Sequence, residues 1–201
     1  MVIVGVTGGL GTGKSTVARL LERWGAHRLD ADAMARAVIA PGTPGWRAVQ
    51  RAFGTQVVRS HGRVDRRTLA RLVFADPRQR ARLNRIIHPR VRRLLQREVT
   101  RWQRRDPQGI VVLDVPLLIE TGLHRRVDVV VLVMATPQQQ VARLQRARGG
   151  SRASILQRAR TQLPLTVKRR YADVRIDNTG SPAQTRQQVR ALWKKLRART
   201  K

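Results

Sequence analysis

The longest apolar stretches of the chain are short, continuous and rich in valine and isoleucine. Three of them cover Met1–Thr7, Ile110–Leu113 and Val127–Val133. Uninterrupted runs of this length are typical of parallel strands that are buried on both faces of a sheet. Two shorter candidates follow at residues 26–29 and at Val174–Ile176. We therefore expect a sheet that is built from these segments.

Apolar residues at helical spacing lie between these runs. In Val17–Trp24 and in Val189–Leu196 they recur every three or four residues, so each segment presents one apolar helix face. Thr136-Pro137-Gln138-Gln139 has the form of a capping box, and Ser181-Pro182 predicts the start of the last helix. Strands that alternate with helices predict an α/β fold, in which helices cover both faces of a parallel sheet.

One long segment interrupts this alternation. Residues 35–105 are mostly helical in pattern and strongly basic. Asp76-Pro77 predicts a helix start, and Pro89 predicts a kink or a restart after His88. We interpret this segment as a helical insertion in a single domain over residues 1–201. The core then comprises about residues 1–34, 106–140 and 163–201.

Composition narrows the class of protein. The chain has 201 residues and no cysteine, which excludes a disulfide framework, a thiolate metal site and a cysteine nucleophile. No apolar run is long enough to span a membrane. The N-terminus has no basic segment before its apolar run, so it does not resemble a signal peptide, and we expect a cytoplasmic protein.

The charge of the chain is strongly one-sided. Against 42 Lys and Arg there are 12 Asp and Glu, a net charge of +30. This excess suggests a polyanionic partner, such as nucleic acid, anionic lipid or a phosphorylated metabolite. Aromatic residues make up only 3% of the chain, so base-stacking platforms are scarce. We expect most arginines to lie on solvated helix faces, and nucleic acid to bind at most non-specifically.

A complete phosphate-binding motif follows the first predicted strand. Gly8–Ser15 matches G-x-x-x-x-G-K-[ST], with a buried strand before it and an amphipathic helix after it. Glycines let the backbone N–H groups converge on phosphate oxygens at the positive end of the helix. Lys14 can reach the β- and γ-phosphates, and Ser15 can ligate Mg²⁺. The residues expected to hold ATP here are Gly9, Gly11, Thr12, Gly13, Lys14, Ser15 and Thr16.

Four of the few acidic residues follow predicted strands. Asp30 and Asp32 come after the second strand, and Asp114 and Glu120 come after the third. Ligands of parallel α/β sheets bind beyond the carboxyl ends of the strands, so all four could face the phosphates. Asp32 is a candidate general base, and Asp114 resembles a Walker-B acid that holds Mg²⁺. Asp30 could equally cap a helix, and Asp114 could form a structural ion pair.

The sequence resembles the dephospho-CoA kinase family, and the matching elements occur in the same order over about residues 2–196. The elements that carry the resemblance are Thr7–Thr16, Asp30-Ala31-Asp32, Ala35-Arg36, Pro41-Gly42-Thr43, Leu69, Phe74, His88-Pro89, Val115–Leu118, Glu120, Gln162 and Ile176-Asp177-Asn178.

The resemblance implies a P-loop kinase fold and ATP-dependent phosphorylation of the ribose 3′-hydroxyl of dephospho-CoA, the last step of coenzyme A synthesis. It makes Asp32 the base on that hydroxyl, and Lys14 and Arg143 its catalytic partners. Arg143 would lie in a small basic lid over about residues 141–162, and Asn178 near the adenine of ATP. The acceptor side would comprise Asp32, Arg36, His88, Pro116 and Leu117, and the metal ligands would be Ser15 and Asp114.

The chain departs from the family pattern at two places. Ile119 stands where the family usually has an aromatic residue, an apolar exchange that we expect to be tolerated. In the lid, Ala147 and Arg148 occupy the positions of a usual Arg-Asp pair. The second lid cation is therefore either Arg146 or Arg148.

Two other functions fit the same motif. One is another small-molecule P-loop kinase, acting on a nucleoside monophosphate or on a pantothenate-like alcohol. The other is a basic nucleic-acid-binding module that uses ATP as a switch. A GTPase is disfavoured, because the chain has no Asn-Lys-x-Asp element. The sequence leaves the oligomeric state open.

Overall fold

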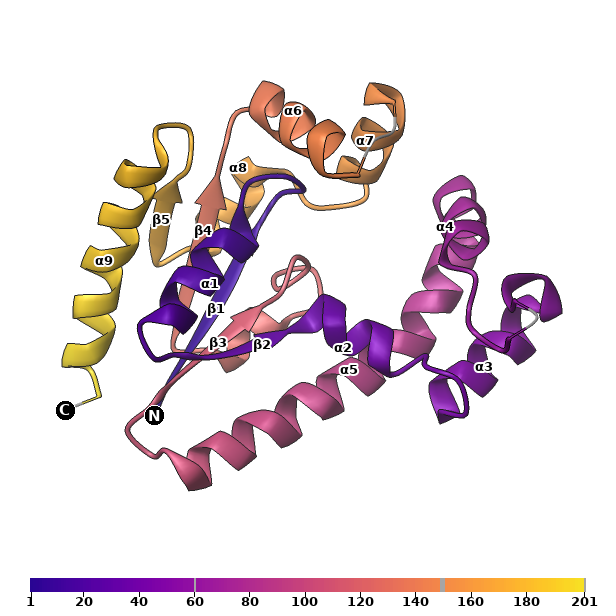
Figure 1. The fold of residues 1–201 in the computed structure, drawn as a ribbon, viewed down its shortest axis with the longest axis horizontal. Coiled ribbons are helices and arrows are strands. Elements are labelled where there is room, and N and C mark those ends of the chain that lie inside the picture. The colour runs from indigo at the N-terminus through magenta and orange to yellow at the C-terminus, as the bar shows by residue number, and fades with distance from the viewer. Residues whose placement is uncertain (60, 149–150, 201) are drawn as a thin grey trace. The chain divides into compact units, whose positions relative to one another are not determined.

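A five-stranded parallel sheet forms the centre of the computed structural model, which describes residues 1–59, 61–148 and 151–200. The strand order is β2-β3-β1-β4-β5 (Figure 1). The strands are β1 (Val2–Gly8), β2 (His27–Asp30), β3 (Ile110–Asp114), β4 (Val129–Met134) and β5 (Val174–Asp177). The five predicted strands are confirmed, with ends that differ by one or two residues.

Position in the sheet explains why three strands were easier to recognise than two. The central strands β1, β3 and β4 are buried along nearly their whole length. The edge strands β2 and β5 are half-buried or exposed at most positions. An edge strand needs fewer apolar side chains, so its sequence signal is shorter and more mixed.

Two helices pack against one face of the sheet (Figure 1). These are α1 (Lys14–Arg23) and α9 (Pro182–Ala198). Val17 and Leu21 of α1 and Val189 of α9 are fully buried there against the valines of β1 and β4. The predicted helix faces are therefore the ones that build this core.

The segment after β3 packs against the opposite face. Leu118 is fully buried and lies so close to Gly5 that a Cβ there would approach its Cδ2 to 2.6 Å. Two 3-10 helices belong to this side, η2 (Leu123–Arg126) and η3 (Arg169–Tyr171). The rings of His124 and Tyr171 join them in an edge-to-face contact at 5.0 Å. The short helix α8 (Leu165–Lys168) directly precedes η3.

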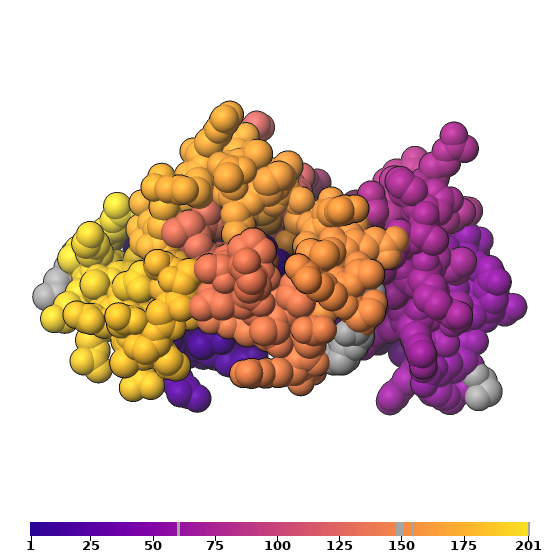
Figure 2. Space-filling model, turned by 90° about the horizontal axis from the view of Figure 1, so that it is seen from above, coloured from indigo at the N-terminus to yellow at the C-terminus, as the bar shows by residue number. Residues whose placement is uncertain are grey.

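Helices α6 (Pro137–Arg148) and α7 (Arg152–Ala159) contact each other and lie on the surface, in orange in Figure 2. The predicted capping box opens α6, because Thr136 and Gln139 exchange backbone and side-chain hydrogen bonds at 3.2 Å. A second capping box, between Ser181 and Gln184, opens α9. Both predicted helix starts are confirmed.

The chain divides into two units, and residues Ala31–Glu98 form the second. It contains α2 (Ala31–Ala37), α3 (Pro44–Phe53), η1 (Thr55–Val57), α4 (Arg66–Ala75) and most of α5 (Pro77–Arg105). Its own core is centred on Val49, Phe53 and Val57.

Of the kink or restart expected at Pro89, the restart is wrong, because α5 continues through that residue. A proline inside a helix removes one N–H donor and crowds the preceding turn. Beside it, the Arg90 guanidinium donates to the Ile86 carbonyl at 2.6 Å. Before the proline, Ile86 and Ile87 pack against the core of the second unit, and after it Val91 and Leu95 are buried. Packing on both sides of the proline therefore favours a continuous helix.

Within the described residues, no helix has the length and apolar content needed to cross a bilayer.

Candidate active site

The glycine-rich loop between β1 and α1 has the conformation that a phosphate-binding turn requires. Gly11 and Gly13 have φ angles of +80° and +90°, a region that side chains other than glycine rarely adopt. The Thr12 hydroxyl donates to the Gly9 carbonyl at 2.9 Å and closes the turn. Gly13 caps α1, so the first backbone N–H groups of that helix are directed at the loop.

Two neighbours pack so closely on this loop that they exclude side chains there. A Cβ at Gly11 would lie 2.6 Å from the Gln140 carbonyl oxygen of α6. A Cβ at Gly13 would collide with the side-chain nitrogen of Asn178, which follows β5. The glycines therefore serve close packing as well as backbone conformation.

Lys14 and Asp114 form a buried ion pair at the carboxyl ends of β1 and β3. The Lys14 ammonium donates to Asp114 Oδ1 and lies 3.5 Å from the Ser15 hydroxyl. The other oxygen of Asp114 accepts from Arg28, at 3.1 Å from Nε and 2.7 Å from Nη2. With 1% of its side chain exposed, Asp114 is held between two cations.

Arg28 is a residue that the sequence analysis missed. Asp30 and Asp114 are register partners, as are Arg28 and Val112, so Arg28 and both acids lie on one face of the sheet. Arg28 also donates to Asp30 at 2.8 Å. Burial would lower the pKa of Arg28, but the hydrogen bond and charge of Asp114 outweigh it, and the pKa is raised. Its signal was a lone arginine two residues before Asp30.

The two residues predicted to hold Mg²⁺ both lie beside the Lys14 ammonium. Ser15 and Asp114 both approach the Lys14 ammonium, and both offer the hard oxygen ligands that Mg²⁺ prefers. No group of three or more His, Cys, Asp or Glu residues that could hold a metal occurs in the described part of the chain.

Arg143 and Asn178 meet at the phosphate loop. Arg143, on α6, donates to the Thr12 carbonyl at 3.3 Å and to the Asn178 carbonyl at 2.8 Å. The Asn178 amide donates to the same Thr12 oxygen at 2.8 Å and accepts from the Thr185 hydroxyl at 2.8 Å. The structure thus brings together Thr12, Arg143 and Asn178, three residues predicted from the sequence, although Thr12 and Asn178 are 166 residues apart in the chain.

Arg146 and Arg148 are the two candidates for the second lid cation. Arg146 is exposed on α6. The side chain of Arg148 lies outside the described residues.

Glu120 does not face the phosphates as expected. Its Oε1 accepts from the Lys168 ammonium at 2.9 Å and from the Leu163 backbone N–H at 2.9 Å. Its carboxylate is therefore committed to α8 and to the segment before it. The half-buried Pro116 lies at the same place, because its carbonyl accepts from Thr7 and Lys168.

Three of the remaining predicted residues, Asp32, Arg36 and His88, belong to the second unit, and Leu117 belongs to the first. Asp32 is exposed in the first turn of α2, two residues after the end of β2, and Leu117 is half-buried. Arg36 lines a cavity of about 470 Å³ in the second unit. Burial lowers the pKa of the half-buried His88.

That cavity is strongly basic. Its lining comprises Arg36, Arg59, Arg63, Arg66 and Arg67, together with His61 and the apolar residues Ile39, Ala40, Pro41 and Val64.

Comparisons with known proteins agree on one family. The family model described as dephospho-CoA kinase matches residues 2–184. A dephospho-CoA kinase from Geobacter metallireducens is 44% identical over 194 residues, covering 96% of each chain. One from Symbiobacterium thermophilum is 45% identical over 194 residues, covering 96% of this chain and 81% of the relative.

Solved structures share the fold. A crystal structure titled TT1252 from Thermus thermophilus has a TM-score of 0.81 and 39% identity, covering 97% of both chains. Dephospho-CoA kinase from Campylobacter jejuni has a TM-score of 0.73 at 20% identity, covering 99% and 98%. Shikimate kinase from Acinetobacter baumannii has a TM-score of 0.57, covering 99% and 94%, which supports the P-loop kinase fold. With its glycine loop, its buried lysine and these relatives, the chain belongs to the dephospho-CoA kinase family, kinases that use ATP to phosphorylate dephospho-CoA.

Proposed function

We propose that this chain transfers the γ-phosphoryl group of ATP to the ribose 3′-hydroxyl of dephospho-CoA and so forms coenzyme A, with Asp32 as the general base. The observation that carries the proposal is the phosphate loop with its paired lysine, Lys14, in a chain of this family. The 3′-oxygen bonds to the γ-phosphorus as the bond to the β,γ-bridging oxygen breaks. ADP leaves, and the hydroxyl proton goes to Asp32.

The phosphate side of the reaction rests on the first unit. Loop N–H groups and the start of α1 would bind the phosphates of ATP, contacting Gly9–Thr16. Lys14 would exchange Asp114 for the β- and γ-phosphates, since a phosphate competes with a carboxylate for the same ammonium group. Arg143 already contacts the loop and would spread the charge that develops on the transferring group.

Mg²⁺ would be held by Ser15 and, directly or through water, by Asp114. Bound there, it would neutralise charge on the phosphate oxygens. Arg28 also occupies one oxygen of Asp114, so only the other could turn toward a metal. This arrangement supports a metal that the protein holds weakly on its own and firmly together with ATP.

The acceptor side rests on the second unit. Dephospho-CoA carries a diphosphate, and the basic cavity that Arg36 lines offers five guanidinium groups and one imidazole. Arginine forms paired, charge-assisted hydrogen bonds with phosphate oxygens. We assign Arg36 and His88 of this unit to the binding of this substrate, together with Pro116 and Leu117 of the first unit. Residues 35–105 then act as an acceptor-binding insertion, and residues 141–162 act as a lid that excludes water.

The decisive experiment measures coenzyme A formation from ATP and dephospho-CoA. Asp32→Asn should lower kcat by about 10²–10⁴-fold with little effect on ATP affinity, because a base acts in the transition state. Lys14→Ala should weaken both. Asp76→Asn is the matched control: this acid belongs to the second unit, and its carboxylate accepts from the Arg78 backbone N–H at 2.7 Å.

Three outcomes would contradict the proposal: a wild-type enzyme that forms no coenzyme A, full turnover in Asp32→Asn, or a control that fails as badly as Asp32→Asn. A screen of nucleoside monophosphates and pantothenate-like alcohols at fixed ATP addresses the rival kinases. Cytoplasmic activity is part of the proposal, because ATP is supplied there.

A further inference from the structure

Lys168 is a buried cation that the proposed reaction leaves unexplained. Its side chain is 0% exposed, and it is the largest of the fully buried side chains of the described residues. Burying an ammonium group costs several kcal/mol unless partners compensate. Such a group persists where its charge or its hydrogen bonds are needed.

The first contact leads to the base of the phosphate loop. The Lys168 ammonium donates to the Pro116 carbonyl at 2.9 Å. That same oxygen accepts from the Thr7 hydroxyl at 3.1 Å. Thr7 is a fully buried residue of β1, immediately before Gly8. One carbonyl oxygen therefore joins α8, the segment after β3 and the strand that carries the loop.

The second contact leads to the helices proposed as the lid. Glu120 Oε1 accepts from Lys168 and also from the Leu163 backbone N–H, both at 2.9 Å. Leu163 follows α7 by four residues, through two turn hydrogen bonds at Thr161 and Gln162. Glu120 Oε2 is buried and has no partner among the described residues. Among the described residues, both hydrogen bonds of this carboxylate are therefore made by Oε1.

Electrostatics also connects Lys168 to the phosphate site. Burial lowers the pKa of Lys168, Glu120 partly restores it, and the positive charge of Lys14 lowers it further. The two ammonium groups therefore lie close enough to repel each other.

We infer that Lys168 is a positioning residue for phosphoryl transfer. It fixes the Pro116 carbonyl against Thr7 beneath the phosphate loop and, through Glu120, anchors the C-terminal end of the lid to the same point. This inference rests on the proposed function. An interaction that holds reacting groups in place affects turnover strongly, because a misplacement of about 1 Å can cost about 10²-fold in rate.

The test separates positioning from mere stability by using four variants. Lys168→Met removes the cation of the pair, Glu120→Gln removes its negative charge, and the double variant Lys168→Met/Glu120→Met replaces the pair with apolar groups of similar size. Asp173→Asn is the matched control. Its carboxylate accepts from the Val130 backbone at 2.7 Å at the amino-terminal edge of the sheet, away from the loop.

We expect kcat of both single variants to fall by roughly 10–100-fold per folded enzyme, with the KM for ATP changed less than about threefold. The double variant should recover the melting temperature lost in the single variants, because an apolar pair replaces an uncompensated buried charge. Its kcat should stay low. Asp173→Asn should lose melting temperature and keep its kcat.

Recovery of kcat together with melting temperature in the double variant would overturn the inference and leave a structural pair only. A normal kcat in Glu120→Gln would also overturn the inference. This kcat can be measured even if Lys168→Met does not fold. Wild-type coenzyme A formation is measured first. Its absence contradicts the proposed function itself, whereas an active wild type with active variants contradicts only the role of Lys168.

Discussion

Asp114 organises the first unit at the scale of a single residue. It divides its two oxygens between Lys14 and Arg28, so one buried carboxylate fixes both cations. Breaking a buried pair by removing one partner leaves an uncompensated charge and typically costs about 3–5 kcal/mol. Arg28 thus stabilises the same carboxylate that the reaction proposed here would use.

His88 provides a prediction at the same scale. Burial lowers its pKa below the usual 6.5, so the unfolded chain binds a proton more readily than the folded one. Stability is then lost as the pH falls through about 6.5 toward the lower pKa of the folded state. His88→Gln should reduce the loss in free energy of unfolding between about pH 7.5 and about pH 5.5.

Urea unfolding at both pH values measures this difference. His61→Gln is the matched control, because His61 is an exposed histidine of the same unit. If His88→Gln loses as much stability on acidification as the wild type, burial of His88 does not govern the pH dependence.

At the scale of elements, the phosphate loop depends on the segments that surround it. Gly13 combines a φ of +90° with the close approach of Asn178. Gly13→Ala should therefore lower ATP affinity by at least roughly tenfold and cost about 1–3 kcal/mol in unfolding free energy. Titration with ATP and urea unfolding measure the two effects.

Gly25→Ala is the control for backbone strain alone. Gly25 has a φ of +106°, with no atom within 4 Å of a Cβ placed there. It should lose stability and keep its ATP affinity. Equal ATP affinities of the two variants would show that Asn178 does not constrain the loop.

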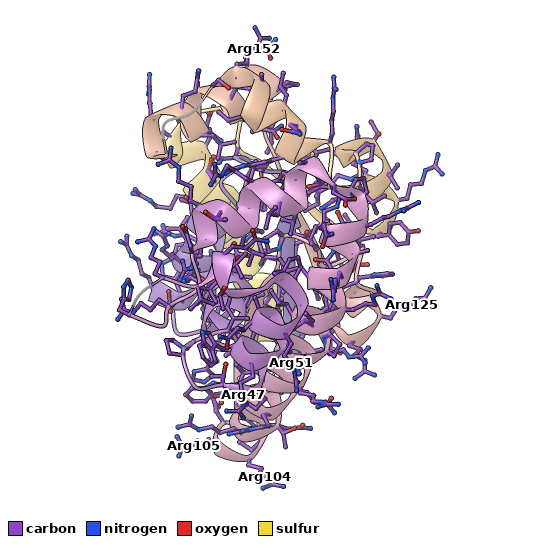
Figure 3. The ribbon with its side chains drawn as sticks, turned by 90° about the vertical axis from the view of Figure 1, so that its right-hand side faces the viewer. Arg47, Arg51, Arg104, Arg105, Arg125 and Arg152 are labelled. Atoms are coloured by element: carbon purple, nitrogen blue, oxygen red, sulfur yellow. The ribbon has the colours of Figure 1, made fainter. Side chains whose placement is uncertain are left out.

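At the scale of the whole molecule, the net charge of +30 lies largely on exposed arginines. Figure 3 shows the labelled side chains of Arg104, Arg105, Arg125 and Arg152 extending away from the ribbon. Arg47 and Arg51, which are also labelled, are exposed residues of α3. Such a surface attracts polyanions without reading their sequence. It also keeps a basic enzyme soluble through mutual repulsion.

We expect duplex DNA to bind weakly, with an affinity that falls by at least roughly tenfold between about 50 and 200 mM salt. ATP turnover should not respond to DNA or RNA. Fluorescence titration at several salt concentrations and a coupled ATPase assay measure both properties. Salt-independent binding, or ATP hydrolysis stimulated by nucleic acid without acceptor phosphorylation, would favour the switch-module alternative.

The sequence by itself determined the sheet, the phosphate loop and the family. Continuous apolar runs and the motif around Lys14 are local patterns, and backbone sterics and burial translate such patterns directly into structure. The restart predicted at Pro89 was wrong because the prediction used only the local preference of proline. Packing of Ile86, Ile87 and Val91 on either side of Pro89 keeps α5 continuous.

Only the tertiary structure decided which charged residues meet. Arg28 pairs with Asp114 across two strands, Glu120 turns to Lys168 instead of the phosphates, and Arg143 meets Asn178 at the Thr12 carbonyl. These partners lie 35 to 166 residues apart in the chain. Their pairing follows from strand register and from the cost of leaving a buried charge alone, neither of which any short stretch of sequence contains.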